Sequence, residues 1–352
     1  MAVFVDYTHV HRQATGLERI SLELFSSAAL DPIKASHITA ASAAGLVLQQ
    51  WIGMPWSALK RPGSVILCPG FPPSIALQSI GQTIIPYVHD LFVVDNPEIL
   101  HRGAYYYCRP SFLHMLRKQS LFLVNSEKTR ADLLGRLERP ARAELYRPRI
   151  QNIFDLRPKA PDLPSDAPIR FVALGTVEPR KNYRYAADII DALNARGCNA
   201  KLRIIGRPGW GPDYPALLGR NHIELLGYLA EAKVRDVVSE SDILISTSLD
   251  EGLGLPLLEL QYAGLLTVAA DIAIFREIME GDCLYVPRAD ASGAADIILQ
   301  RLKSGDWRAT GVDRALRILD RHNRRAARDR ETVVSLIQEA ERTALAAAGS
   351  AA

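Results

Sequence analysis

Two acidic residues and a Gly-x-Gly stretch follow an apolar run in the second half of the chain. Segment 246–271 reads STSLDEGLGLPLLELQYAGLLTVAAD. Proline is favoured in the first turn of a helix, so we expect a helix to begin at Leu255 or Pro256. Unpaired amides at a helix N-terminus attract phosphate and hydroxyl groups. The pattern therefore predicts a diphosphate or sugar site at four consecutive amides, those of Gly252, Leu253, Gly254 and Leu255.

Glu251 and Glu259 stand on either side of this glycine turn. Glu251 is expected in the loop and Glu259 in the first turn of the helix. Carboxylates placed in this way can bind the two ends of one extended ligand, each by accepting hydrogen bonds from a pair of hydroxyls. The alternative is that Glu259 only complements the helix dipole and Glu251 is solvated.

A second candidate site lies in VALGTVEPRKNYRYAADII, residues 172–190. Arg180 and Lys181 come between an apolar strand and a helix that we expect Asn182 to cap. Two cations at such a junction suit a pyrophosphate, with Arg as a bidentate fork and Lys as a point charge. A solvated basic loop is the alternative.

Several other chemistries find no support in the sequence. GLGLPL lacks the third glycine and the following acidic strand end of a dinucleotide fingerprint, and no Gly-Lys-Ser/Thr phosphate loop is present. No Asp-x-Asp motif occurs. The four cysteines, Cys68, Cys108, Cys198 and Cys283, are too scattered for a metal or redox motif and indicate reduced thiols.

Short apolar runs alternate with helical patterns twice along the chain, which predicts parallel α/β architecture. In the first half the strands are expected at 2–6, 37–41, 64–68, 83–89 and 121–125. In the second half they are expected at 169–176, 201–206, 222–229, 242–247 and 266–271, and a helical, strongly charged stretch follows at 308–346. Strands this apolar on both faces belong in sheets covered by helices on each side. The Pro- and Asp-rich stretch 156–168 reads as a linker.

The length of 352 residues predicts two domains. We place them at 1–160 and 168–330, with a C-terminal helix and frayed tail at 331–352. No apolar run is long enough to span a membrane, and the N-terminus does not resemble a signal peptide. Residues 1–160 hold 18 Lys+Arg against 12 Asp+Glu, which indicates either an anionic partner or an ordinary charged face.

Taken together, GTVEPRKN and EGLGLPLLE, in this order and roughly 70 residues apart, resemble the retaining GT-B glycosyltransferases of family 4. The spacing of Glu251 and Glu259 matches that family's Glu-x7-Glu motif. The resemblance covers the second domain, including DCLYVPRAD (282–290). In the first domain it includes THVHRQATGLERISLEL, YVHDLFVVDNPE and LFLVNSEKTRADLL.

The resemblance implies a GT-B fold, with two doubly wound Rossmann-like domains facing across a cleft. The N-terminal domain then binds the acceptor and the C-terminal domain the nucleotide sugar. Glu251, Lys181 and His89 are implied as catalytic: Glu251 at the donor sugar, Lys181 on the diphosphate and His89 beside the sugar. Gly16 and Arg180 would lie near the donor phosphates, the amides of 252–255 would bind sugar and phosphate, Glu259 would hold the ribose, and 226–229 would pass beside the base.

Many family members carry Arg where this chain has Thr176, so either Arg180 replaces that charge or Lys181 and backbone amides suffice. The variant GTxEPRKN resembles a subgroup rich in mannosyltransferases. The implied function is a retaining hexosyl transfer, mannosyl from GDP-mannose, to a glycan or lipid-linked acceptor in polysaccharide biosynthesis. No cofactor, metal or nucleic acid is expected, and the implied location is cytoplasmic.

The basic helix RPSFLHMLRKQ carries Phe112, Leu113 and Leu116 beside Arg109, Arg117 and Lys118. It fits peripheral contact with an anionic membrane and equally an ordinary, partly buried helix. Two other functions remain open for the chain. One is a nucleotide-sugar 2-epimerase of GT-B fold, and the other is a non-catalytic scaffold that binds sugar nucleotides.

Overall fold

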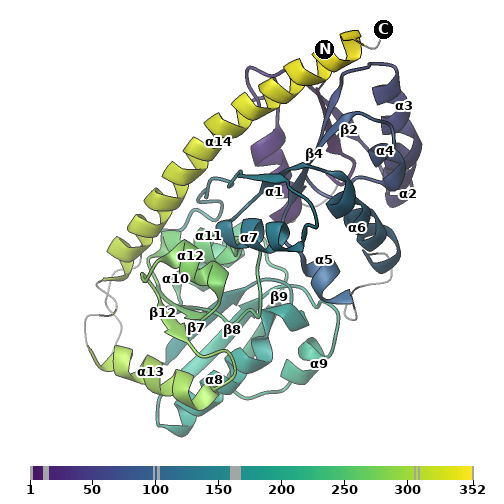
Figure 1. Ribbon diagram of the computed structural model, residues 1–352. Coiled ribbons are helices and arrows are strands. Elements are labelled where there is room, and N and C mark those ends of the chain that lie inside the picture. The colour runs from purple at the N-terminus through teal and green to yellow at the C-terminus, as the bar shows by residue number, and fades with distance from the viewer. Residues whose placement is uncertain are drawn as a thin grey trace. The chain divides into compact units, whose positions relative to one another are not determined.

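The computed structural model describes residues 3–10, 16–97, 100, 104–158, 168–304, 307 and 310–350 (Figure 1). The chain divides into two compact units. Unit 1 comprises Met1–Arg149 together with Asn323–Ala352, and unit 2 comprises Ile150–His322. The first boundary therefore precedes the expected linker, of which residues 159–167 lie outside the described part of the chain.

Unit 1 contains a 6-stranded parallel sheet in the order β2-β1-β3-β4-β5-β6. Its strands are β1 (Val3–Tyr7), β2 (Ala35–Thr39), β3 (Val65–Cys68), β4 (Thr83–Val88), β5 (Leu121–Val124) and β6 (Arg142–Leu145). Its helical segments before β6 are α1 (Gly16–Phe25), α2 (Ala43–Leu48), η1 (Gln49–Gly53), α3 (Met54–Leu59), α4 (Ile75–Gln78), α5 (Phe92–Asp95), η3 (Ala104–Cys108), α6 (Arg109–Lys118) and α7 (Glu127–Arg136).

Unit 2 contains a second 6-stranded parallel sheet in the order β12-β11-β10-β7-β8-β9. Its strands are β7 (Ile169–Leu174), β8 (Ala200–Ile205), β9 (Ile223–Gly227), β10 (Ile243–Ser246), β11 (Leu266–Ala270) and β12 (Leu284–Val286). Its helical segments are η4 (Pro179–Lys181), α8 (Tyr183–Ala195), α9 (Asp213–Leu217), α10 (Glu231–Ser239), α11 (Leu255–Glu259), η5 (Leu260–Ala263), α12 (Ala273–Met279) and α13 (Ala291–Lys303).

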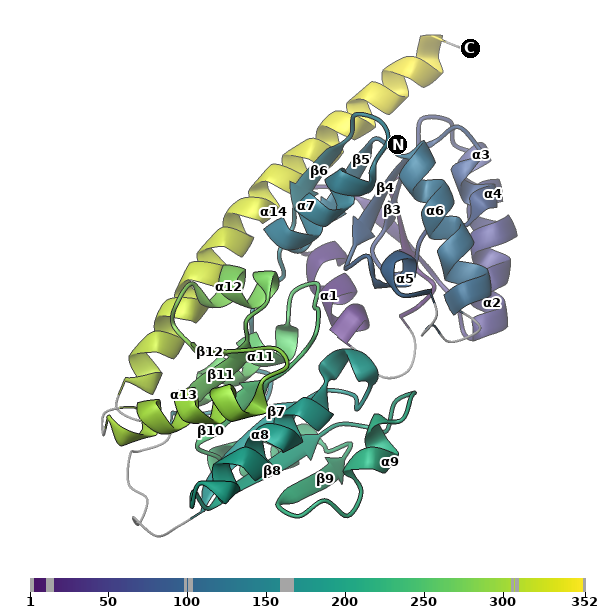
Figure 2. The ribbon, with the colours of Figure 1, turned by 60° about the horizontal axis from the view of Figure 1, so that its bottom comes forward.

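Neighbouring residues of the unit 2 strands pack into two separate cores, one on each face of the sheet. Phe171 packs with α8 and α13 in one core, whereas the next residue, Val172, packs with α10, α11 and α12 in the other. Figure 2 shows α8 and α13 side by side along one face of this sheet. Two doubly wound, Rossmann-like units are therefore present, and the predicted fold class is confirmed.

The C-terminal helix α14 (Gly311–Ser350) contributes to both units, because the division falls at His322. In unit 1, Arg147 Nη1 lies 2.7 Å from Asp329 Oδ2, and Arg330 Nε donates to the carbonyl of Ala29 at 2.9 Å. Of the expected C-terminal helix and frayed tail at 331–352, residues 331–350 are helical and belong to unit 1.

The sequence analysis missed β6 and β12, each at one edge of its sheet. Strand β6 reads RAEL, with charged residues at alternate positions, and β12 has only 3 residues. An edge strand pairs on one side only, so it needs no long apolar run and leaves a weak signal in the sequence.

Close approach of β7 and β8 predicts a strict requirement for glycine at position 206. A Cβ there would stand 1.8 Å from the carbonyl oxygen of Gly175, so Gly206→Ala must push the two strand ends apart. We expect a loss of about 1–3 kcal/mol of unfolding free energy, measured by chemical denaturation.

Gly135→Ala is the control, because a Cβ in that part of α7 meets nothing within 4 Å. It should stabilise by about 0.5–1 kcal/mol. Equal stability of Gly206→Ala and the wild type would contradict the close approach.

Candidate active site

Glu251 is held between the two cations predicted to bind a diphosphate. Its Oε1 lies 2.5 Å from Lys181 Nζ, and its Oε2 lies 2.6 Å from Arg180 Nη1. Ser248 Oγ donates to the same carboxylate at 2.8 Å, and Glu178 Oε1 lies 3.1 Å from Arg180 Nη2. Segments more than 60 residues apart thus converge on one charged cluster, which we call the Glu251 cluster: Glu178, Arg180, Lys181, Ser248 and Glu251.

The strand order explains why these residues meet. Strand β7 pairs with β8 on one side and β10 on the other, so the chain reverses its winding direction between β7 and β10. Ligands of doubly wound sheets bind at the carboxyl ends of the strands beside such a reversal. The loops after β7 and β10 are tied directly, since Leu249 N donates to the Arg180 carbonyl at 2.8 Å and Thr247 Oγ1 to the Lys181 carbonyl at 3.1 Å.

The cations determine the ionisation of Glu251. Burial by itself would raise the pKa of this carboxyl, but Lys181 and Arg180, with the Lys181 and Ser248 hydrogen bonds, outweigh burial and lower it to about 2. Burial raises the pKa of Glu178, and Arg180 and Lys181 offset only part of that rise. Glu251 is therefore a carboxylate throughout the neutral range.

The turn after Glu251 forms largely as predicted. Helix α11 begins at Leu255, and Gly254 before it has φ of 77°, a left-handed conformation that favours glycine. The Leu253 side chain is packed into a core of unit 2, so its position in the turn is anchored. Glu259 ends α11 and is 6% exposed. Gly252 lies buried between Glu251 and Leu253.

Little free space remains inside this arrangement. The cavity bordered by Lys181, Glu251 and Gly254 measures about 10 Å³, which is at the lower limit for one water molecule. A ligand that reaches the Lys181 ammonium from this side must therefore displace part of the Glu251 cluster.

Asn182 does not cap α8 as predicted. It occupies the N-cap position, but its backbone is left-handed with φ of 52°, and its side chain makes no capping hydrogen bond. An N-cap side chain reaches the first helical amides from an extended backbone, which Asn182 lacks. Its backbone conformation instead follows the short helical turn η4, which ends at Lys181.

In unit 1, His89 follows β4 at the carboxyl edge of the sheet. Its Nε2 donates to the Pro69 carbonyl at 2.7 Å, and its ring packs edge-on against Tyr87. Burial lowers its pKa, although the Pro69 hydrogen bond and Asp90 oppose the shift. His89 is thus held as a neutral imidazole with its proton on Nε2.

A second histidine, which the sequence analysis did not select, lies at the same edge. His9 follows β1, is 4% exposed and shares a 2.8 Å hydrogen bond with Ser21 Oγ. The Ser21 hydroxyl also lies 3.4 Å from the Pro69 carbonyl that His89 contacts. Gly16 is the first residue of α1, and residues 11–15 of the loop before it lie outside the described part of the chain.

The residues that were missed had identifiable signals. Glu178 belongs to the GTVEPRKN motif itself, and Ser248 lies directly before LDEG. His9 follows the first predicted strand, which places it at the carboxyl edge of a parallel sheet. In each case only the fold reveals the partner, because the partner is distant in sequence.

The predicted lipid-facing side of α6 is largely buried instead. Phe112 and Leu116 pack with β4, β5 and α7 in a core of unit 1, and Leu113 is half-buried. Of the two interpretations of this basic helix, the structure supports the partly buried one. No helix among the described residues is long and apolar enough to cross a membrane.

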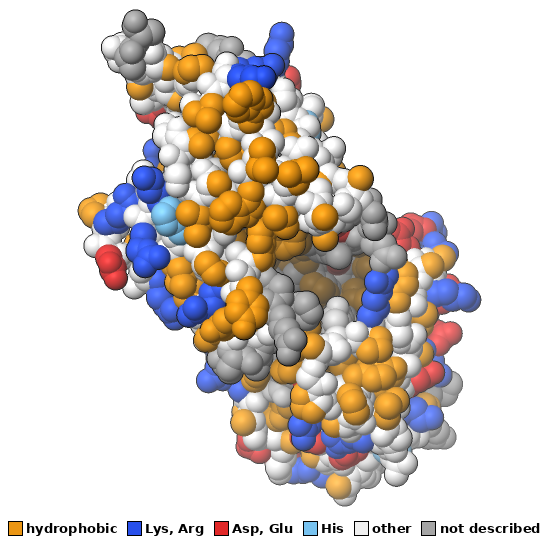
Figure 3. Space-filling view, turned by 90° about the vertical axis from the view of Figure 1, so that its right-hand side faces the viewer, with side chains coloured by type: hydrophobic (Ala, Val, Ile, Leu, Met, Phe, Trp, Pro, Cys, Tyr) orange, Lys and Arg blue, Asp and Glu red, His pale blue; other side chains and the backbone are white. Residues whose placement is uncertain are grey.

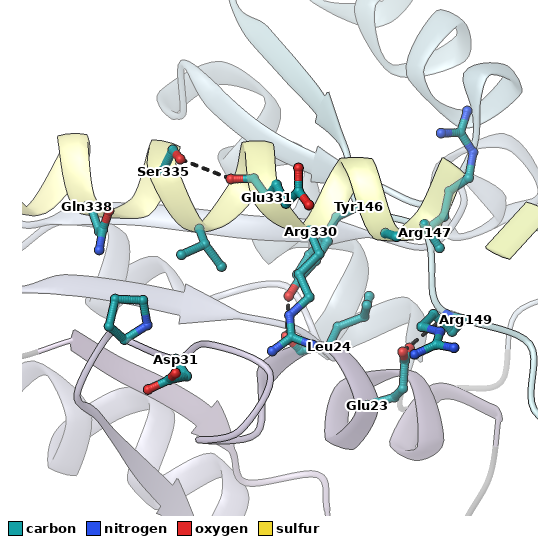
Figure 4. A pocket seen from close by; sticks show the side chains of 14 residues that line it. Glu23, Leu24, Asp31, Tyr146, Arg147, Arg149, Arg330, Glu331, Ser335 and Gln338 are labelled. Carbon is teal, nitrogen blue, oxygen red and sulfur yellow. Dashed lines mark hydrogen bonds between the residues drawn. The ribbon is translucent and has the colours of Figure 1, made fainter. Parts of the chain in front are cut away.

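A larger cavity, of about 600 Å³, lies within unit 1 between α14 and α1 (Figure 4). Arg149 and Arg330 border it, together with Glu23, whose pKa burial raises to about 7. It contains none of the residues predicted to bind the donor. In the described ranges, no group of three or more His, Cys, Asp or Glu side chains is arranged to hold a metal ion.

The ionisation of Glu251 predicts how stability depends on pH. Because its pKa is lowered from 4.5 to about 2, its contribution is present above pH 4.5 and is lost as the pH falls toward 2. We expect Glu251→Gln to lower the unfolding free energy by roughly 3 kcal/mol at pH 7 and by progressively less below pH 4.5. Urea denaturation from pH 3 to 7 measures this, with the exposed Glu224→Gln as control. A difference that does not change with pH would contradict the assigned ionisation.

Comparisons with known proteins match the chain to glycosyltransferases. Residues 168–304 match the family model described as glycosyl transferases group 1. The serotype-specific mannosyltransferase WbdA of Escherichia coli is 31% identical over 121 residues, which is 33% of this chain and 15% of that protein. The O-antigen chain mannosyltransferase B of Escherichia coli is 24% identical over 245 residues, 65% of this chain and 63% of the relative. The chain thus spans less than two thirds of either relative.

Solved structures share the fold over nearly the whole chain. WaaG, a glycosyltransferase involved in lipopolysaccharide biosynthesis, has a TM-score of 0.68 at 14% identity, covering 96% of this chain and 99% of its own. Anabaena Alr3699/HepE in complex with UDP and glucose has a TM-score of 0.65 at 16% identity, covering 96% and 99%. The fold is therefore GT-B, and within it residues 168–304 match the glycosyl transferases group 1 model.

Proposed function

We propose that the protein is a retaining glycosyltransferase of family 4, which moves a hexosyl unit from a nucleotide diphosphate sugar to a glycan or lipid-linked acceptor. The proposal rests on one observation: the Glu251 carboxylate contacts both Lys181 and Arg180. This contact lies at the carboxyl ends of β7 and β10, where the unit 2 sheet reverses its winding direction. Two cations and a permanently ionised carboxylate at one point suit a ligand that has both a diphosphate and hydroxyls.

In this proposal the donor diphosphate competes with Glu251 for the two cations. Glu251 neutralises Lys181 and Arg180 before the donor binds, which avoids leaving buried positive charge without a partner. Phosphate oxygens take over these contacts when the donor binds, and the carboxylate is released to accept hydrogen bonds from the sugar hydroxyls.

Bond cleavage between the anomeric carbon and the phosphate oxygen places growing negative charge on the departing diphosphate. Lys181, Arg180 and the amides from Gly252 to Leu255 supply fixed positive potential for that charge, which is more effective in a site from which water is excluded. Such an arrangement needs no divalent metal. Because the pKa of Glu251 is about 2, this carboxyl is not a proton donor at neutral pH. We assign deprotonation of the acceptor to the leaving phosphate, on the same face of the sugar, which accounts for retention.

We further propose that the donor is GDP-mannose. The two Escherichia coli relatives are named as mannosyltransferases, and the GTVEPRKN variant resembles a subgroup rich in such enzymes. At the predicted base segment 226–229, the Tyr228 ring is 69% exposed and has Arg207 Cζ 4.4 Å from its centre. An exposed aromatic ring backed by a cation offers a surface for a nucleobase. We place His89, Gly16 and Glu259 at the donor sugar, donor phosphates and ribose respectively.

The proposed acceptor is a growing polysaccharide or its lipid carrier, as the relatives' O-antigen and lipopolysaccharide names suggest. We place the reaction in the cytoplasm, where free thiols are maintained, since all four cysteines are unpaired with one another. Neither point depends on the donor chemistry.

Substitution in the Glu251 cluster tests the transferase proposal. We expect Glu251→Gln and Lys181→Ala each to lower the rate of sugar release from the donor, in EDTA, by roughly 100- to 1000-fold, because each removes charge used in the transition state. GDP-mannose and UDP-glucose are the donors to assay by product detection. Lys233→Ala is the matched control, since this exposed lysine forms only a surface pair with Asp236. Unchanged rates in either cluster variant, or activity only with added Mg²⁺, would contradict the mechanism.

A further inference from the structure

The continuous helical stretch formed by α2, η1 and α3, residues 43–59, is apolar on both of its sides. Its inner side is buried at every fourth residue, namely Leu46, Gln50, Met54 and Ala58. Its outer side exposes large hydrophobic side chains: Leu48 at 58%, Ile52 at 61%, Trp56 at 61%, Leu59 at 53% and Trp51 at 41%. A surface helix of a soluble domain normally carries polar residues at such positions.

Exposed aromatic residues of a neighbouring segment extend this surface. Tyr107 of η3 donates to Gln50 Oε1 of η1 at 2.8 Å, which fixes the two segments together. The residues before it, Tyr105 and Tyr106, are 40% and 76% exposed. We call the whole set the apolar face: Leu48, Trp51, Ile52, Trp56, Leu59, Tyr105 and Tyr106. Figure 3 shows hydrophobic side chains gathered on the side of unit 1 where α2 and α3 lie, with basic side chains at their margin.

The two sequence intervals that supply the apolar face carry charges of one sign. The sequence has no Asp or Glu between Asp31 and Asp90, nor between Glu98 and Glu127, and these two intervals supply every residue of the face. They contain seven basic residues, of which Lys60 and Arg61 directly follow α3. Lys60 Nζ lies 4.8 Å from the centre of the Trp56 ring, and Arg109 Cζ lies 5.8 Å from that of Tyr105.

We propose that the apolar face of unit 1 docks on the surface of an anionic lipid bilayer. Trp and Tyr are the side chains enriched where a bilayer meets water, and aliphatic residues between them bury into the boundary of the acyl chains. Lys60, Arg61 and Arg109 lie where lipid headgroups would be, and the absence of acidic residues from both intervals removes repulsion by anionic lipids. The surface is separate from the Glu251 cluster, which belongs to unit 2.

This surface replaces the one that the sequence suggested on α6. There Phe112 and Leu116 are buried and Leu113 is half-buried, so Arg117 and Lys118 have no exposed apolar partners among these three residues. The α2–α3 stretch was not predicted as a membrane-binding surface. Only the structure shows that most of its large apolar residues face outward.

Flotation with vesicles tests the proposal. We expect the protein to bind vesicles of phosphatidylcholine with 30% phosphatidylglycerol, to bind pure phosphatidylcholine vesicles much more weakly, and to lose affinity in high salt. The double variant Ile52→Ser/Trp56→Ser should weaken binding to the anionic vesicles at least tenfold. Lys60→Gln/Arg61→Gln should weaken it severalfold and reduce its dependence on salt. Fluorescence of the tryptophans should shift to shorter wavelength on binding.

A matched control is provided by two leucines elsewhere that are equally exposed, Leu218 at 59% and Leu316 at 57%. Leu218→Ser/Leu316→Ser should bind vesicles as the wild type does. The proposal is overturned if the wild type binds no vesicles, if this control loses binding as strongly as Ile52→Ser/Trp56→Ser, or if only Arg117→Gln/Lys118→Gln abolishes binding. A concentration-dependent dimer that the Ile52→Ser/Trp56→Ser variant alone disrupts, without vesicle binding, would assign the face to a second copy instead. The assay contains no donor, so its failure leaves the transferase proposal standing.

Discussion

The contact of one buried carboxylate with two cations is the interaction on which the site depends. Lys181 and Arg180 lower the pKa of Glu251 and so keep it ionised. The two cations in turn need an anion beside them, because Lys181 is only 9% exposed. Removing one member of such a group leaves buried charge without compensation, which costs more than the contact itself contributes. A ligand that brings its own negative charge can substitute for the carboxylate without that penalty. In the proposed function, the contact that stabilises the domain is therefore also the one that an anionic ligand replaces.

The fold supplies this contact through the order of its strands. Neighbouring positions of β7 and β10 bring together the loops that follow them, although Lys181 and Glu251 are 70 residues apart. Glycines shape the strand ends around this site: Gly206 after β8 admits the Gly175 carbonyl after β7, and Gly254 adopts the left-handed turn before α11. In unit 1 the corresponding edge carries His9 and His89, which are linked through Ser21 and Pro69. Each sheet thus concentrates its polar groups at its carboxyl edge.

Interior strands, the α11 start and the cation pair were predictable from sequence because apolar runs and proline leave local signals. Edge strands β6 and β12 left none, since RAEL is half charged and LYV has only 3 residues. The conformation of Asn182 depends on the preceding turn rather than on its own propensity. The apolar side chains of α6 are largely buried, whereas large ones of α3 are exposed, because different neighbours cover the two helices. The periodicity of apolar residues along each helix does not reveal which neighbours those are. Glu178 and His9 were missed for the same reason, because their partners are set by topology.

The Glu251 cluster is proposed to bind the diphosphate of the donor. The direct measurement is calorimetric titration of GDP, UDP, dTDP and ADP, each beside its monophosphate, into the wild type and Lys181→Ala. We expect one diphosphate to bind the wild type at least tenfold more tightly than its monophosphate, and Lys181→Ala to abolish that preference while monophosphate binding persists. If no diphosphate is preferred, or if the preference survives in Lys181→Ala, the cluster is not the diphosphate site.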